Sequence, residues 1–201
     1  ILATPQTSEG IAMKLNYCVF HLLVAASLTV GFPTTGRAEC GASEPDGARL
    51  EAAFIEGAPI DRLRLSNRTD QDWQVTRVTW NLADSAGRTF FDVSAAGDGV
   101  EVFQPFRVIE SGDGMAAVLS RQPVVRDGDQ SLDLNFSSFG AGQTFDMSID
   151  VDDRLDGRQT VVSGSEIAGA KLVVEWTAPG GSKALRTMVF DDAARARDCL
   201  K

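Results

Sequence analysis

Apolar and polar residues alternate in short runs between Arg49 and Phe190, and turns rich in Gly, Asp, Asn and Ser separate the runs. A period of two residues is typical of β-strands that bury one face, and no stretch shows the 3.6-residue period of a long helix. The pattern predicts about ten short strands, at residues 49–55, 60–66, 73–82, 88–93, 100–109, 115–119, 132–136, 145–151, 171–177 and 184–190.

Several local features refine this prediction. The alternation changes phase at Thr76-Arg77, which indicates a β-bulge. Gly140-Ala141-Gly142 lies between the strands at 132–136 and 145–151 and predicts that they form a hairpin. Pro179-Gly180-Gly181 joins the last pair of strands in the same way. Asp191 is placed to cap a short helical turn that leads to Cys199.

About ten short strands in a domain of this size predict an all-β fold, a single antiparallel β-sandwich of jelly-roll or immunoglobulin-like type. Trp80 and Trp176 share the phase of apolar neighbours, so both are expected in the core. Trp73, at the start of a strand, is the tryptophan expected to reach the surface.

The first part of the chain has the layout of a secretory signal peptide. Met13-Lys14 starts a basic region, Leu15–Val30 is largely apolar, and Gly36 and Ala38 supply the small residues of a cleavage site. The apolar run is short for a bilayer span. The sequence therefore predicts residues 1–38 as upstream residues plus a signal that starts at Met13. It predicts 39–201 as the β-sandwich domain, which is periplasmic or extracellular and has no membrane span in its mature form.

Two cysteines remain after cleavage, Cys40 and Cys199, at opposite ends of the domain; Cys18 leaves with the signal. In an oxidising compartment such a pair is expected to form a disulfide. Closing so long a loop stabilises a domain by about 5 kcal/mol at most in the chain-entropy model. Two free thiols are the alternative.

The composition excludes several classes of function. Removal of Lys14, Arg37 and Glu9 with residues 1–38 leaves 17 of 19 basic and 27 of 28 acidic side chains, a net charge of −10, which argues against nucleic-acid partners. The single histidine, His21, and the single tyrosine, Tyr17, also lie in the predicted signal. Histidine-based nucleophilic catalysis and histidine-ligated metals are therefore excluded for the mature domain.

An acidic cluster near residue 150 is the most suggestive candidate site. With the apolar residues of 145–151 in the core, the period of two places Asp146, Ser148, Asp150 and Asp152 on the opposite face, which we expect to be solvated. Calcium prefers several carboxylate and carbonyl oxygens, so Asp150, Asp152, Asp153 and Asp156 are predicted as a calcium site. Calcium is the one cofactor that the sequence suggests.

Other interpretations of these acids remain open. The spacing fails the EF-hand pattern, because Arg154 occupies the fifth position counted from Asp150. A solvated strand end, with Arg154 and Arg158 as ion-pair partners, is the simplest alternative. A glycosidase pair that includes Glu166 is another, and it would need a groove between two carboxylates. We assign no catalytic residue.

Four segments resemble the secreted bacterial proteins described as aggregation factor core, found mainly in marine alphaproteobacteria. They are residues 58–62 (APIDR), 99–106 (GVEVFQPF), 149–153 (IDVDD) and 162–170 (VSGSEIAGA), and they occur in order through most of the domain. The resemblance implies an adhesive role at the cell surface or outside the cell, and it supplies no catalytic residues.

The leading functional prediction is an exported, non-catalytic β-sandwich, assisted by calcium, for adhesion or for binding of an extracellular or envelope polysaccharide or protein. A carboxylate-based enzyme that acts on polysaccharide is the first alternative. A purely structural envelope protein is the second.

Overall fold

The computed structural model describes residues 49–57, 60–69, 72–95, 97–99, 102–109, 115–155 and 161–199, without the side chains of 198 and 199. These residues belong to one compact unit, Ala38–Lys201. Cys40, Asp156 and Arg158 lie outside the described residues, as does the predicted signal peptide. The predictions made for them stay predictions.

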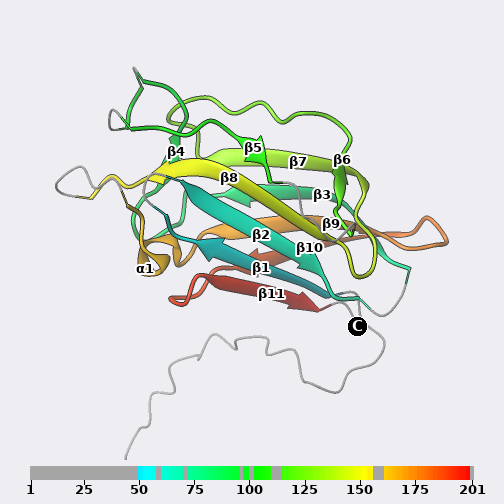
Figure 1. Ribbon diagram of the computed structural model, residues 1–201. Helices are drawn as coiled ribbons and strands as arrows, with labels where there is room; N and C mark the ends of the chain where they lie inside the picture. The colour runs from blue at the N-terminus through cyan, green and yellow to red at the C-terminus, as the bar shows by residue number, and fades with distance from the viewer. Residues whose placement is uncertain are drawn as a thin grey trace, which may run out of the picture. The chain divides into compact units, whose positions relative to one another are not determined.

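The described residues form two antiparallel sheets, so the predicted all-β sandwich is confirmed (Figure 1). The first sheet has six strands in the order β11-β1-β2-β8-β4, with β5 also paired to β8. Its strands are β1 (Arg49–Ile55), β2 (Asp61–Asn67), β4 (Phe90–Asp92), β5 (Arg107–Val108), β8 (Thr144–Asp152) and β11 (Arg195–Cys199).

The second sheet has five strands in the order β10-β9-β3-β7-β6 and forms the rear layer in Figure 1. Its strands are β3 (Gln74–Asn81), β6 (Val118–Leu119), β7 (Ser131–Ser138), β9 (Lys171–Thr177) and β10 (Lys183–Val189). A four-residue helix, α1 (Gly164–Ile167), precedes β9. No helix among the described residues is long and apolar enough to cross a membrane.

The core lies between the two sheets, where the inward faces of both meet. Trp80 and Trp176 are fully buried, as the alternation predicts. The ring of Trp80 packs against Phe54 and Phe91 from the first sheet, with ring centroids 6.2 and 5.3 Å apart. Trp73 is half-buried against the same core, so it does not offer the exposed platform that its position suggested.

Two local predictions are confirmed by the strand pairing. The register of β3 with β9 shifts between Val75 and Arg77, which is the bulge expected at Thr76-Arg77. β9 and β10 form the predicted hairpin over their full length. Gly181 in its turn has φ of 80°, a conformation that glycine adopts readily.

The predicted hairpin between β7 and β8 is wrong, because the two strands lie in different sheets. Each strand directs its apolar face into the same core from opposite layers, and the rings of Phe136 and Phe145 meet there at 5.1 Å. The chain crosses from one sheet to the other through Gly140-Ala141-Gly142. An arch of this kind and a hairpin have the same alternation, so sequence periodicity does not distinguish them.

The end of the domain also differs from expectation. Asp191 does cap a turn, since its Oδ1 accepts hydrogen bonds from the amides of Ala193 (2.9 Å) and Arg195 (3.0 Å). The turn leads into strand β11 rather than into a helical turn. β11 pairs antiparallel with β1, which places Cys199 opposite Arg49 in the register.

Candidate functional site

The outer face of β8 carries the predicted acids, yet they are buried. Alternation places Asp146, Ser148, Asp150 and Asp152 opposite the core residues of this strand, as predicted. The expectation of a solvated face is wrong, because Asp150 is 1% and Asp152 2% exposed. Buried carboxylates need a compensating partner, so their burial strengthens the case for a site on this face.

Short chain segments cover this end of β8. Strand β4 pairs with it in a register that sets Asp92 opposite Asp150. The segment before β5 lies alongside as well, since the amide of Asp150 donates to the carbonyl of Gln104 at 3.0 Å. These segments exclude water from acids that the sheet alone would leave exposed.

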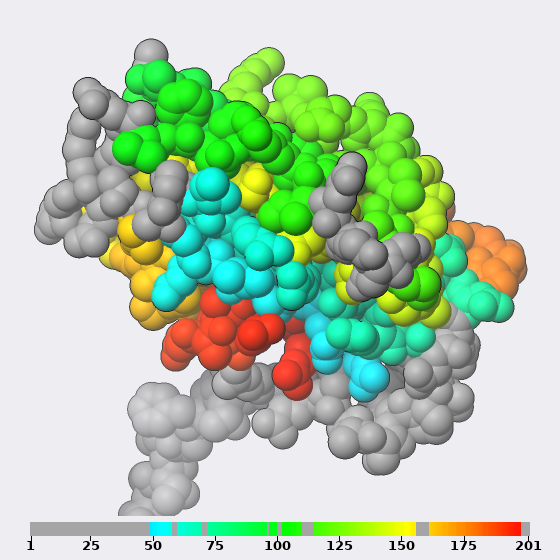
Figure 2. Space-filling view, in the orientation of Figure 1, coloured from blue at the N-terminus to red at the C-terminus, as the bar shows by residue number. Residues whose placement is uncertain are grey.

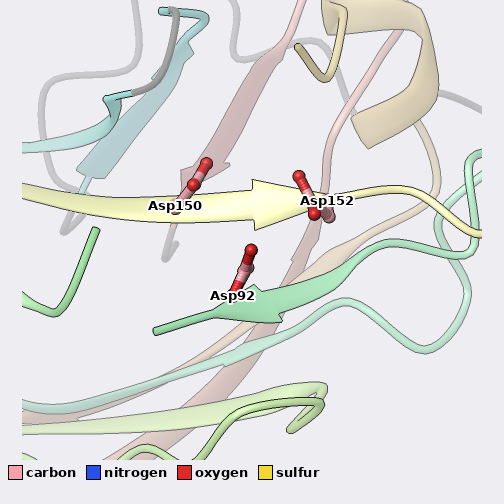
Figure 3. Close-up of side chains that lie close together, drawn as sticks. All are labelled: Asp92, Asp150 and Asp152. Atoms are coloured by element: carbon pink, nitrogen blue, oxygen red, sulfur yellow. The ribbon is translucent and has the colours of Figure 1, made fainter. Parts of the chain in front are cut away.

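Asp92, Asp150 and Asp152 form a compact carboxylate cluster, which Figure 3 shows between β4 and β8. One carboxylate oxygen from each lies within 4.8 Å of the others. Gly99 packs directly on the cluster: a Cβ at this position would lie 2.1 Å from Asp92 Oδ2 and 2.6 Å from Asp152 Oδ2. The backbone can approach the three carboxylates this closely because residue 99 has no side chain.

Two members of the cluster have no basic partner among the described residues. Both carboxylate oxygens of Asp150 and both of Asp92 are buried without a donor in good hydrogen-bond geometry. Weaker contacts with the amides of Val151 and Ser94 only partly offset the burial of Asp150 and Asp92, respectively. Neither acid forms an ion pair within that same part of the chain. The carboxyl of Asp127 approaches Asp92, and the two can share a hydrogen bond only when one of them carries a proton.

The electrostatics of the cluster follow from this arrangement. Burial, with the charges of Asp152, Asp61 and Asp92 adding to it, raises the pKa of Asp150 to about 8. Burial, the contact with Asp127 and the charge of Asp152 raise the pKa of Asp92 to about 7. Near neutral pH these carboxyls therefore either hold protons or require a cation.

Two neighbouring acids are used differently, because backbone amides satisfy them. Asp61 accepts hydrogen bonds from the amides of Gly57 (3.0 Å) and Val151 (3.1 Å). Asp127 accepts from the amides of Val93 (2.9 Å) and Asp98 (2.6 Å). Both carboxylates tie chain segments around the cluster to the sheet.

Burial and hydrogen bonding together raise the pKa of one of these two acids and lower that of the other. For Asp61, burial outweighs its hydrogen bonds and raises the pKa to about 8. For Asp127, burial alone would raise the pKa, but hydrogen bonds from the backbone and Asp92 outweigh it and lower the pKa. Asp127 is therefore the acid beside the cluster that is built to remain ionised.

Arg154, considered above as an ion-pair partner of the acids near residue 150, pairs with a different acid. Arg154 is half-exposed, and its Nη2 binds Asp98 Oδ2 at 3.1 Å. Its guanidinium also lies 4.6 Å from the centroid of the Phe90 ring. The arginine next in sequence to the predicted site thus lies over β4 without pairing with Asp92 or Asp150.

The structure brings together two of the four residues predicted as calcium ligands. Asp150 and Asp152 belong to the cluster. Asp153 is not a member; its Oδ1 accepts from the amide of Leu155 at 2.7 Å, while its Oδ2 is buried without a partner. Asp156 is not among the described residues.

Glu166, the acid considered for a glycosidase pair, has a local structural role. Its Oε2 accepts hydrogen bonds from the amide and the hydroxyl of Ser163, both at 2.7 Å, which caps α1. It is not part of the cluster at Asp92. The cluster therefore does not supply the glycosidase pair of Glu166 with Asp150 that the sequence left open.

Asp92 is the member that the sequence interpretation missed. It lies at the end of a strand prediction, residues 88–93, that was made from the apolar run around Phe90 and Phe91. Asp92 lies on the same face of the strand as Phe90, because side chains alternate between faces. A carboxylate on the same face as a buried aromatic residue is a sequence signal that could indicate a buried acid. Its pairing with Asp150 depends on the register between strands about sixty residues apart, which local sequence does not encode.

The donor set determines what the cluster can bind. Three carboxylates from two strands offer only oxygen atoms, which suit hard cations. Oxygens within 4.8 Å of one another can surround one ion at Ca²⁺–O distances of about 2.3 to 2.6 Å.

Comparison with known proteins adds no assignment. No family model, no curated protein and no solved structure matches this chain. The resemblance to aggregation factor core proteins stays a prediction from sequence.

Proposed function

We propose that this protein is an exported, non-catalytic β-sandwich that binds calcium at Asp92, Asp150 and Asp152 and serves in adhesion at the cell surface. The observation that carries the proposal is the pair of buried carboxylates, Asp92 and Asp150, that have no donor in good hydrogen-bond geometry and no basic partner among the described residues. A divalent cation would supply the missing charge and ligation.

Calcium fits the cluster better than other metals do. Magnesium binds with near-ideal octahedral geometry and retains several waters, whereas these carboxylates are 2% exposed or less. Zinc and copper sites in proteins draw on histidine or cysteine, and the cluster contains neither. Because Gly99 has no side chain, its backbone lies beside the carboxylates of Asp92 and Asp152. Calcium sites commonly combine carboxylate oxygens with backbone carbonyl oxygens.

A cation here would act on structure rather than on a substrate. It would join β4 to β8 and hold the segment around Gly99 against them. Glycoside hydrolysis needs carboxylates that a sugar can reach on both sides of the scissile bond. Acids buried to this degree favour a structural ion, which supports the non-catalytic proposal.

The adhesive part of the proposal rests on the predicted export signal and on the resemblance to aggregation factor core proteins. A calcium-stabilised sandwich is suited to binding a polysaccharide or protein outside the cell, where calcium is plentiful. Extracellular calcium modules bind with Kd of about 10⁻⁴ to 10⁻³ M.

Thermal unfolding in calcium and in EGTA tests the metal site. At 10 mM calcium, such a Kd gives a stabilisation of about 1.4 to 2.7 kcal/mol. For a domain of this size the Tm should rise by roughly 3 to 10 °C. Magnesium at the same concentration should have a clearly smaller effect.

Matched variants make this test specific. Asp150→Asn removes one ligand charge and should abolish the calcium shift while the protein still unfolds cooperatively. Asp72→Asn removes an exposed carboxylate outside the cluster and should retain the full shift. Equal shifts in both variants, or no shift in the parent protein at 10 mM calcium, would contradict the proposed site.

A further inference from the structure

The outer face of the first sheet also carries a concentration of arginines, away from the carboxylate cluster. Arg64, Arg68, Arg195 and Arg197 line a polar groove of about 210 Å³. Glu51 is its one acidic lining residue. We call these four residues the arginine face; it stands out on a chain whose net charge is −9.

Strand register explains why the arginines converge. Ala52, Ala196 and Leu65 point into the core, so the residues that alternate with them point outward. One row across the sheet reads Arg195, Ala53, Arg64, and the next reads Arg197, Glu51, Ser66. Figure 2 shows the residues of β11 beside those of β1 and β2 on this surface.

Ala53 forms the floor between two arginines. Neighbouring strands are about 4.8 Å apart, so the Cα atoms of Arg195 and Arg64 are separated by about 10 Å. A small residue between them leaves a depression, and because Arg64 directs its guanidinium to Asp146, Arg195 is the arginine of this row that has no acid partner among the described residues. Ala53 is itself only 6% exposed.

Arg64 of this face, together with its neighbour Arg62, already binds a carboxylate. Arg62 and Arg64 both donate to the carboxylate of Asp146, with Nη2–Oδ2 distances of 2.5 and 2.7 Å. Arg68 approaches Glu51, with its Nε 3.5 Å from Oε2. Arg62 contacts both oxygens of Asp146, through Nε and Nη2, in the fork-like geometry by which guanidinium groups recognise planar carboxylates.

Arg195 and Arg197 differ from these neighbours. Both are exposed, and neither pairs with an acid in the described part of the chain. Two donor groups on successive outward positions of β11, about 7 Å apart, are thus available to an external ligand.

We propose that the arginine face binds the carboxylates of an acidic polysaccharide, with Arg195 and Arg197 as its principal contacts. This inference rests on the proposed adhesive function and names its ligand class and surface. Glu51, whose side chain is 39% exposed in this groove, can accept hydrogen bonds from sugar hydroxyls, and it would repel a ligand made of acid groups alone. The acidic remainder of the protein would repel nucleic acid, with a charge every 1.7 Å, more strongly than a polysaccharide that carries about one carboxylate per sugar.

Binding to polygalacturonate at 150 mM NaCl tests the proposal, using the full chain in EGTA so that calcium neither occupies the carboxylate cluster nor crosslinks the polymer. The double variant Arg195→Gln/Arg197→Gln should weaken binding at least about tenfold, the loss expected for a charge-assisted hydrogen-bond pair. The control Arg121→Gln/Arg126→Gln removes two exposed arginines between β6 and β7, and it should bind like the parent protein.

A charge-conserving variant separates recognition from general attraction. Arg195→Lys/Arg197→Lys keeps both charges but loses the planar fork, so it should also bind several-fold more weakly. Parent-like binding by this variant, or equal loss in the control pair, would overturn the proposal. So would tighter binding to dextran sulfate or single-stranded DNA than to polygalacturonate, or equal binding to neutral dextran.

The result is independent of the metal site. Because EGTA is present throughout, Asp150→Asn should bind polygalacturonate like the parent protein. Polymer binding by a parent protein that shows no calcium shift would contradict the calcium proposal alone. A calcium shift with no polymer binding would overturn the arginine face alone.

Discussion

Asp146 and Asp150 lie on the same face of the same strand, and both are almost fully buried. Two arginines bind Asp146, whereas Asp150 has no basic partner among the described residues. The difference arises from the neighbouring segments. β2 supplies Arg62 and Arg64 beside Asp146, and β4 supplies a further acid, Asp92, beside Asp150. Burial alone therefore does not define a site; the charge of the facing strand does.

The largest expected contrast is in the pH dependence of stability without metal. The pKa of Asp150 is raised to about 8 in the folded protein, against about 3.9 in an unfolded chain. The folded state then binds more protons, so the free energy of unfolding falls as pH rises from about 4 to 8. Between pH 5 and pH 8 the loss should be on the order of 3 kcal/mol for one such carboxyl.

Urea unfolding of metal-free protein at several pH values measures this loss. Asp92, with its pKa raised to about 7, adds to the effect in the same direction. Asp127, whose pKa is lowered, titrates below this window. Asp150→Asn should flatten the profile, and saturating calcium should flatten it as well, because the bound ion keeps the carboxyls of the cluster unprotonated across this pH range. A flat profile in the metal-free parent protein would contradict the electrostatic description of the cluster.

The next contrast compares amide substitutions at the two acids. Asp146→Asn leaves Arg62 and Arg64 without their shared carboxylate, and it should destabilise the protein by about 2 to 3 kcal/mol. Asp150→Asn, measured in EGTA at pH 8, removes an uncompensated buried charge and should be neutral or stabilising. Urea unfolding of both variants under identical conditions checks this. Similar losses at both positions would show that the two acids do not differ as described.

The smallest expected effect concerns an ion pair on the open arginine face. Arg68 and Glu51 are 51% and 39% exposed and 3.5 Å apart, so solvent screens them. Arg68→Gln should change the free energy of unfolding by about 0.5 kcal/mol or less. A loss comparable to that of Asp146→Asn would mean that exposure does not separate the two kinds of pair on this sheet.

The sequence predicted the strands well where alternation is regular. β1 and β9 begin and end at the expected residues, and the bulge in β3 lies at the expected phase change. Alternation reports which face of a strand is apolar, but it does not report which sheet the strand joins. For this reason alternation predicts a hairpin where the structure has the arch between β7 and β8.

The candidate site was predicted only in part for a similar reason. Period-two geometry located Asp150 and Asp152 on the outward face, where they are. It also assigned that face to solvent, because nothing local indicated that β4 and the segment at Gln104 would cover it. Asp92 and Gly99 contribute through tertiary register, which alternation within one strand does not contain.

The pairing of β1 with β11 has a consequence for biosynthesis. Arg49 lies opposite Cys199 in the register, 150 positions later in the chain. β1 therefore acquires one of its two neighbours only after about 150 further residues have been made. Such long-range pairing is typical of slowly folding β-proteins. A ribosome that delivers this chain from its N-terminus thus holds back completion of this sheet until β11 emerges.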